Sequence, residues 1–251
     1  MQTRVKGDVD TGDPETGMVV ERRFTTAGDD PFDAFEWIEM DVEIRNPDGS
    51  MADSIEGVKL PSGFAGVPGK VCAQKYLRKA GVPKHLRKVA EDDIPVWLQR
   101  SEPDHEKLQT IEADERMGGE TNGRDLFRRL AGTWTYWGWK YGYFAGEADA
   151  RAYFDEMCYV IASQRSAPNS PQWFNTGLHW AYGIEGPAQG HSFVNPETAE
   201  LEYSTNAYEH PQPHACFIQS VSDSLVGGTE SIMGLWNREA LLFKYGSGTG
   251  S

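Results

Sequence analysis

Cys216 is the residue of this 251-residue chain whose type and position most favour chemistry. It opens a short apolar run directly after the proline-rich segment HPQPH at residues 210–214. Ligand sites are common where strands meet loops, so this thiol could be reactive, with a structural thiol as the alternative. Cys72 and Cys158 accompany the apolar faces of expected helices, and we interpret both as buried structural thiols. Three widely spaced cysteines favour neither a disulfide framework nor a zinc site.

Three histidines and a glycine-rich segment are the other candidates. His210 and His214 have the i, i+4 spacing at which two histidines of a helix bind one metal ion, with His191 nearby. The two intervening prolines forbid a helix there, so we expect no metal site. The segment GSGTGS at 246–251 would let backbone amides approach a phosphate or a sugar. It lacks the Gly-Lys-Ser/Thr ending of a Walker loop, and its composition alone favours a flexible end or an engineered linker.

Composition argues against several classes of function. The 38 acidic and 24 basic side chains leave a formal net charge of −14, which disfavours nucleic-acid or membrane-surface binding without a basic patch. The aromatic block at 134–144 carries little basic charge and favours core packing over base stacking. No apolar run approaches the roughly 18 residues of a membrane span, and residues 1–10 have no apolar signal-peptide core. We expect a cytoplasmic protein with reduced cysteines.

Hydrophobic periodicity predicts the elements that position these residues. Residues 37–45 alternate apolar and polar side chains before the turn NPDG at 46–49, which predicts a hairpin continuing past Met51. Helices are expected at about 71–80, ended by Gly81, and at about 149–165, ended by two prolines.

The carboxy-terminal third is expected to hold one strand and one further helix. The run 215–221 suits a buried strand. A helix is predicted from Thr229, as N-cap, to Lys244. Its inward-facing side chains would be Ile232, Leu235, Trp236, Leu242 and Phe243.

Several ordered motifs resemble one enzyme family. They are SAPNSPQWFNTG at 166–177, PHACF at 213–217 followed by DSL at 223–225, and LFKYGSGTGS at 242–251. Weaker similarity includes ERRFTT at 21–26, KYLRKAGVP at 75–83 and the aromatic block at 134–140. Together they resemble the amino-terminal part of the large catalytic chain of adenosylcobalamin-dependent class II ribonucleotide reductases, over most of the chain from about residue 20.

The resemblance implies an α/β fold with a helical N-terminal region and the first part of a ten-stranded ribonucleotide reductase α/β barrel, truncated. We divide the chain into a mobile leader at 1–20, a mainly helical region at 21–165 and the start of the barrel at 166–251. The helical region would include an early β-hairpin and a polar insertion near 100–125. The implied reaction is reduction of ribonucleoside diphosphates to deoxyribonucleoside diphosphates by thiyl-radical chemistry.

The resemblance also implies roles for single residues. Cys216 would be the first cysteine of the redox pair, delivering reducing equivalents at the 2′ position of the sugar. Ser170 would help to hold the substrate phosphates, and Ala215 would contact substrate through its backbone. Ser247 and Gly248 would lie against the nucleoside.

Asp223, Ser224 and Leu225 would match the deoxynucleotide effector site, with the Asp223 carboxylate accepting from a sugar hydroxyl. A helix-capping role is the alternative for Asp223. The implied cofactor is adenosylcobalamin, with much of its site expected outside this chain. The implied partners are a ribonucleotide substrate, a deoxynucleotide effector, a thioredoxin-like or other dithiol reductant, the carboxy-terminal remainder of the reductase and a second copy in a homodimer.

The family pattern continues beyond Ser251 with the thiyl-radical cysteine, its companion Asn and Glu, and the second redox cysteine. We therefore expect a truncated, split or intein-interrupted product that is inactive alone. Two alternatives are a fragment of a class I reductase large subunit and a non-catalytic nucleotide-binding remnant.

Overall fold

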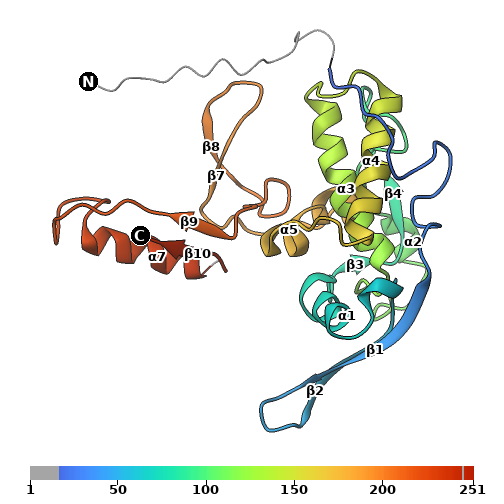
Figure 1. Cartoon of the computed structure of the whole chain (residues 1–251), viewed down its shortest axis with the longest axis horizontal. Coiled ribbons are helices and arrows are strands. Elements are labelled where there is room, and N and C mark those ends of the chain that lie inside the picture. Colours follow the sequence, from blue (N-terminus) through green and yellow to red (C-terminus); the bar gives the residue numbers. More distant parts are fainter. Residues whose placement is uncertain (1–16, 245) are drawn as a thin grey trace.

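Two long helices, α3 (Gly123–Lys140) and α4 (Glu147–Ala162), lie side by side and contribute much of the hydrophobic core of the computed structural model, which describes residues 17–244 and 246–251 (Figure 1). The Asn122 side chain caps α3 by accepting a hydrogen bond from the Arg124 backbone amide at 3.0 Å. The expected helix at 149–165 is confirmed as α4, which ends before the proline tract. No helix among the described residues is long and apolar enough to cross a membrane.

Small residues form much of the buried face of α3. Gly132 lies against Trp180, and Gly138 lies against the Phe144 ring, with no room for a Cβ atom at either position. The expected core packing of the aromatic block is confirmed in part. Trp134 packs against the hydrophobic core and the Phe144 ring covers Gly138, whereas Tyr143 is exposed.

The predicted hairpin is confirmed as an antiparallel pair of β1 (Trp37–Arg45) and β2 (Met51–Pro61). The Asp48 carboxylate stabilises the turn by accepting from the Ser50 backbone amide at 2.9 Å and from its hydroxyl. The base of the hairpin joins the core through Val42, Val58 and Leu60, while its tip projects from the body (Figure 1).

The next helical turns begin and end earlier than the predicted helix at 71–80. A short 3₁₀ turn, η1 (Ser62–Phe64), precedes α1 (Val67–Val71), which continues into a π-helical turn, η2 (Cys72–Tyr76). Pro68 lies in the first turn of α1, where its missing amide costs no hydrogen bond. Leu77 then becomes extended and inserts its side chain into the core, which ends the helix.

Short elements make up the rest of the fold, and every sheet of the described residues has two strands. The expected α/β class is confirmed, and no sheet of the described part closes into a barrel. The expected leader at 1–20 lies largely outside the described residues. Met18, near its end, donates its backbone N–H to the Tyr143 carbonyl at 2.7 Å. The remaining elements are β3 (Val82–Pro83) paired with β6 (Met117–Gly118), β4 (Leu86–Lys88) paired with β5 (Ser101–Pro103), β7 (Ser192–Val194) paired with β8 (Leu201–Tyr203), and the helices α2 (His105–Leu108), α5 (Ser170–Asn175) and α6 (Leu178–Tyr182).

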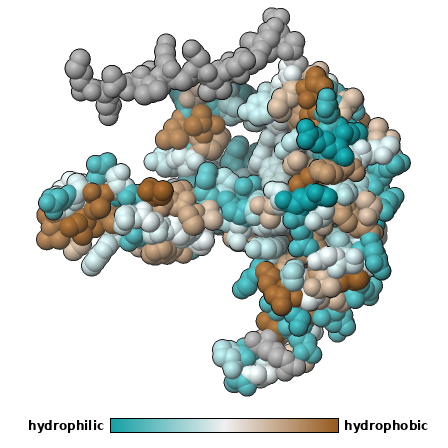
Figure 2. Space-filling model, in the orientation of Figure 1, coloured by the Kyte–Doolittle hydropathy of each residue, from teal (hydrophilic) through white to brown (hydrophobic). Residues whose placement is uncertain are grey.

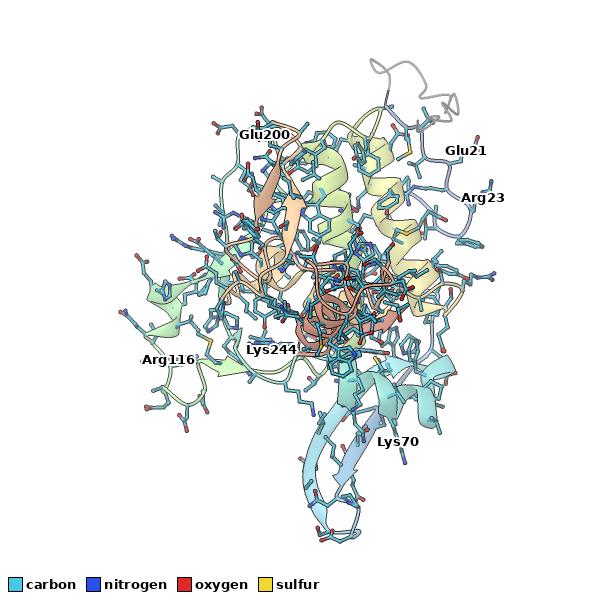
Figure 3. All side chains as sticks on the ribbon, turned by 90° about the vertical axis from the view of Figure 1, so that its left-hand side faces the viewer. Glu21, Arg23, Lys70, Arg116, Glu200 and Lys244 are labelled. Atoms are coloured by element: carbon cyan, nitrogen blue, oxygen red, sulfur yellow. The ribbon has the colours of Figure 1, made fainter. Side chains whose placement is uncertain are left out.

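The last part of the chain forms a parallel crossover of β9 (Cys216–Ile218), α7 (Ile232–Lys244) and β10 (Gly248–Gly250). Figure 1 shows this unit to one side of the α3–α4 body, with α5 between them. Figure 3 views the molecule from that side and shows Glu200 near the outer end of the β7–β8 hairpin and Lys244 at the end of α7.

Two expectations for this unit are wrong. The strand at 215–221 is not buried, since the Ile218 side chain of β9 is 98% exposed, and α7 buries Leu235 while Trp236 and Phe243 are exposed. Hydrophobic side chains consequently gather on the surface of this unit (Figure 2). Apolar periodicity identifies a face that can be covered, but nothing among the described residues covers this one.

The predicted N-cap of α7 is also wrong. The Ser231 hydroxyl, and not Thr229, accepts a hydrogen bond from the Gly234 backbone amide at 3.1 Å. Serine satisfies an orphan amide of the first turn in the way that a threonine would. The helix therefore begins two residues later than the composition suggested.

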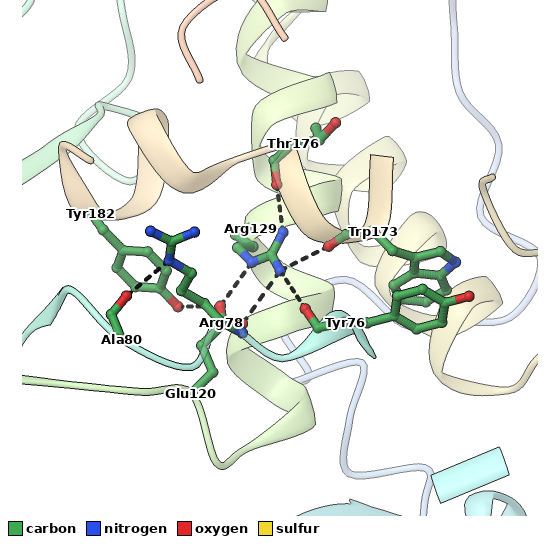
Figure 4. A network of polar contacts seen from close by, with 8 residues as sticks. All are labelled: Tyr76, Arg78, Ala80, Glu120, Arg129, Trp173, Thr176 and Tyr182. Atoms are coloured by element: carbon green, nitrogen blue, oxygen red, sulfur yellow. Dashed lines mark hydrogen bonds and ion pairs between the residues drawn. The ribbon is translucent and has the colours of Figure 1, made fainter. Parts of the chain in front are cut away.

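A buried ion pair connects the body to the elements near the site (Figure 4). The Arg129 guanidinium of α3 pairs with the Glu120 carboxylate at 2.7 Å, and both side chains are almost completely buried. Arg129 also donates to three backbone carbonyl oxygens, those of Tyr76, Trp173 and Thr176, at 3.1, 2.9 and 2.6 Å. One side chain therefore joins α3, η2 and α5.

Glu120 extends this network to two further elements. Its carboxylate accepts from the Tyr182 hydroxyl of α6 at 2.7 Å and from the Arg78 backbone amide at 2.7 Å. Burial, together with the neighbouring Glu120 charge, raises the pKa of Tyr182, which keeps this phenol protonated and able to donate.

Replacing Arg129 with Met is expected to lower the free energy of unfolding by about 3–5 kcal/mol, because the Glu120 charge would stay buried without its partner. Urea denaturation followed by circular dichroism measures this loss. The matched control is Arg87→Met, which removes an exposed pair with Glu102 and should cost less than about 1 kcal/mol. Equal losses in the two variants would contradict the structural role of Arg129.

Candidate functional site

The parallel strands β9 and β10 bring together four of the predicted site residues. Cys216 is paired with Gly248 in the register of the two strands. The Gly248 backbone amide donates to the Ala215 carbonyl at 2.6 Å, and Ser247 precedes it directly. The strand pairing therefore brings two pairs of neighbouring residues, more than 30 positions apart in the chain, to one small surface at the start of both strands. The pairs are Ala215 with Cys216 and Ser247 with Gly248.

The environment of Cys216 leaves its thiol accessible. The side chain is exposed and forms no disulfide. A Cβ atom on Gly248 would lie 3.4 Å from the Cys216 sulfur, which is close to the limit of ordinary contact. Glycine at this position therefore keeps the space beside the sulfur open for another molecule.

The other two cysteines are buried, as predicted. Burial, with a smaller contribution from the Glu120 charge, raises the pKa of Cys72 to about 12. Burial also raises the pKa of Cys158 well above its ordinary value. Because the thiolate is the reactive form, Cys216 is the thiol of this chain that is suited to chemistry.

Gln212 holds the proline-rich loop against β10. Its side-chain amide donates to the His214 carbonyl at 2.8 Å and to the Ser247 hydroxyl at 3.0 Å, and its oxygen accepts from the His214 backbone amide. Ser247 is buried and donates its own hydroxyl to the His214 carbonyl at 3.1 Å. Sequence reasoning missed Gln212. The signal in the sequence was its place between two prolines. Because prolines have no backbone N–H to donate, side-chain hydrogen bonds must hold such a loop in place.

Ser170 lies on α5, between Pro168 and Pro171, and is exposed. Its hydroxyl lies 3.2 Å from the Tyr76 hydroxyl. No hydrogen bond among the described residues joins Ser170 to β9 or β10. The same helix nevertheless faces the region of these strands, since Gln172 lines a cavity that it shares with them.

That cavity has a volume of about 1300 Å³. Its lining comes from α3, α5, β7, the proline-rich loop, β9 and α7, and includes Phe217 and Ser247. Ala215, Cys216 and Gly248 are not in the lining, although His214 and Phe217 are. The exposed thiol therefore lies outside the cavity, beside its lining residues.

The predicted effector residues lie in the loop between β9 and α7. Asp223 is exposed, and its carboxylate accepts no hydrogen bond from any described residue, so the alternative of a capping role is not observed. The backbone carbonyls of Ser224 and Leu225 instead accept from the Ile232 and Met233 amides at 3.0 and 3.2 Å. The loop is therefore fastened to α7 by its backbone, and the Asp223 side chain remains available.

Metal-binding side chains do not gather among the described residues, where no group of three or more His, Cys, Asp or Glu could hold an ion. One His191 ring nitrogen lies 2.5 Å from the His210 carbonyl oxygen, and the His210 ring stacks on Phe193. Through these contacts, the His210 segment packs against the start of the β7–β8 hairpin.

Native chain treated with iodoacetamide is expected to be modified first at Cys216, because this thiol is exposed and the other two are buried with raised pKa values. At equal access, a pKa of about 12 in place of 9.0 would leave Cys72 with a thiolate fraction roughly a thousandfold smaller. Peptide mass mapping over time measures the order. Modification of Cys72 or Cys158 at the rate of Cys216 in folded protein would contradict the structure.

Replacing Gln212 with Ala is expected to speed amide hydrogen exchange at Gly248 by about five- to tenfold, because the loop that carries its acceptor loses its tie to Ser247. Gln189→Ala is the control, since this glutamine makes no hydrogen bond among the described residues. Residue-resolved exchange by NMR measures both variants. Unchanged exchange at Gly248 in Gln212→Ala would show that the loop is held in another way.

Comparisons with known proteins agree with these features. Residues 39–164 match the family model described as class II vitamin B12-dependent ribonucleotide reductase. Proteins named vitamin B12-dependent ribonucleotide reductase are similar over most of the chain. The relative from Agrobacterium fabrum is 58% identical over 236 residues, 93% of this chain and 18% of its own length. The relative from Bradyrhizobium diazoefficiens is 56% identical, over 93% of this chain and 19% of its own length.

A more distant relative, from Rhodopirellula baltica, is 30% identical over 250 residues, which are 99% of this chain and 20% of the relative. The chain thus spans about a fifth of the length of these relatives. The match to the class II model also favours class II over the class I alternative. This chain belongs to the family of class II vitamin B12-dependent ribonucleotide reductases.

Proposed function

We propose that this chain supplies part of the substrate site and one redox thiol for the reduction of ribonucleoside diphosphates to deoxyribonucleoside diphosphates by thiyl-radical chemistry. The observation that carries the proposal is the parallel pairing of β9 and β10, which sets the exposed Cys216 beside Gly248. A thiol on a paired strand is held in a defined position, while its open side admits a sugar.

The proposed redox step balances with two thiols. The C2′–O bond of the ribose breaks, the hydroxyl leaves as water and a C–H bond forms at the same carbon. The two electrons and two protons come from Cys216 and a second cysteine elsewhere in the complete enzyme, which become a disulfide. A thioredoxin-like or other dithiol then reduces this disulfide for the next turnover.

The contacts already made by each residue refine its proposed role. The Ala215 carbonyl accepts from Gly248, so its substrate contact is assigned to its backbone amide. The Ser247 hydroxyl is engaged with Gln212 and His214, and its backbone amide donates to the Leu242 carbonyl at 3.0 Å, so Ser247 is assigned to the nucleoside through its backbone carbonyl. Ser170 keeps an exposed hydroxyl that is suited to a phosphate oxygen.

The β9–α7–β10 unit is proposed to begin an α/β barrel that further strands complete. Its exposed apolar side chains on both β9 and α7 support this, because an apolar surface of this kind marks an interaction site. The free carboxylate of Asp223, with Ser224 and Leu225, is proposed to accept from the sugar hydroxyl of a deoxynucleotide effector, in an enzyme that forms a homodimer.

Adenosylcobalamin is the proposed cofactor, after the names of the relatives. When bound, it would supply the radical that starts the reaction. Among the described residues, the polar side chains at the start of β9 and β10 are already hydrogen-bonded to one another and offer this cofactor no free partner. We assign none of them to this cofactor.

The test uses the complete reductase with CDP, adenosylcobalamin and a dithiol. Cys216→Ser should abolish multiple-turnover formation of dCDP, because one half of the disulfide is lost, and should preserve CDP binding. Cys158→Ala, which removes a buried thiol of α4, is the control and should keep turnover. Sustained normal turnover in Cys216→Ser would contradict the redox role, and CDP binding without reduction by the wild-type protein would favour a non-catalytic nucleotide-binding module.

A further inference from the structure

We propose that Tyr76 is a positioning residue for the substrate phosphates, acting through the hydroxyl of Ser170. This inference rests on the proposed function, which assigns Ser170 to those phosphates. The observation is the distance of 3.2 Å between the two hydroxyl oxygens, which belong to residues 94 positions apart in the chain. Tyr76 lies in the motif KYLRKAGVP, but the sequence assigned no role to its hydroxyl.

Both ends of Tyr76 are fixed by neighbours. Its backbone carbonyl accepts from the buried Arg129 guanidinium at 3.1 Å. Its ring stacks on Trp173 of α5, with ring centroids 5.2 Å apart and planes inclined by 17° (Figure 4). Because Trp173 and Ser170 belong to the same helix, this stacking holds the phenol in register with the serine.

The chemistry of the pair gives Tyr76 its function. A serine hydroxyl carries one hydrogen, which rotates freely unless a neighbour fixes it. A phenol is a stronger acid than an alcohol, so the favoured arrangement has Tyr76 donating to the Ser170 oxygen. The Ser170 hydrogen is then turned away from Tyr76 and is ready to be donated to a phosphate oxygen.

A purely structural role explains this contact less well. Both hydroxyl groups lie at the surface, where water can replace the bond between them at little cost to stability. The stacking on Trp173 and the bond to Arg129 use the ring and the backbone of Tyr76 and do not need its hydroxyl. Removing only this hydroxyl therefore separates positioning of Ser170 from stability of the fold.

The experiment measures steady-state reduction of CDP by the complete reductase and by its Tyr76→Phe, Ser170→Ala and doubly substituted forms. Tyr76→Phe should raise KM for CDP by about three- to tenfold, the range expected for the loss of one hydrogen bond between neutral groups, with kcat and thermal midpoint unchanged. In the Ser170→Ala background, Tyr76→Phe should have no further effect. The control is Tyr159→Phe, whose ring also stacks on an aromatic side chain, Phe24, and whose hydroxyl has no partner among the described residues.

The outcomes separate this inference from the proposed function. If Ser170→Ala raises KM and Tyr76→Phe leaves it within twofold of wild type, the role of Tyr76 is overturned while that of Ser170 stands. Additive effects in the double variant, or a fall in kcat alone, would also overturn it. An unchanged KM in Ser170→Ala would overturn the phosphate contact of the proposed function itself.

Discussion

The buried Arg129–Glu120 ion pair is the constraint on which the geometry of this chain depends. A guanidinium removed from water must have most of its N–H groups paired, and Arg129 satisfies this need with one carboxylate and three backbone carbonyls. Those carbonyls belong to η2 and to the α5 region. Because the buried guanidinium needs these acceptors, it fixes both segments against α3. The position of Ser170 follows from that arrangement.

The second half of the proposed site is held by different means. In β9 and β10 the backbone supplies the pairing, and Gln212 supplies the side-chain bonds that the neighbouring prolines cannot make. These bonds hold the loop that precedes Cys216 in place, next to an apolar surface. The contrast is physical: the helical body has its own core, whereas the β9–α7–β10 unit presents apolar side chains that further structure could cover.

The sequence predicts local features of this fold better than its long-range ones. The β1–β2 hairpin follows from alternation and the NPDG turn, and the end of α4 follows from two prolines, since both depend on neighbouring residues alone. Glu120 lies in a very polar stretch and is nevertheless buried, because its partner Arg129 lies on the next helix. Its burial could not be read from local polarity.

The candidate site shows the same division. The motifs identify Cys216, Ser247 and Gly248, and the strand pairing brings them together. Tyr76 and Gln212 were missed because their roles come from contacts with Ser170 and Ser247, which only the folded chain reveals. The exposure of β9 was mistaken for burial because an apolar run does not specify what covers it.

The most direct measurement of the central claim is a crystal structure of the complete reductase with CDP bound. The account predicts that the diphosphate lies against the Ser170 hydroxyl, and that C2′ of the ribose lies beside the Cys216 sulfur, near Gly248. A nucleotide bound productively with its phosphates away from α5, or with its ribose away from β9 and β10, would contradict the claim that these elements form one substrate site.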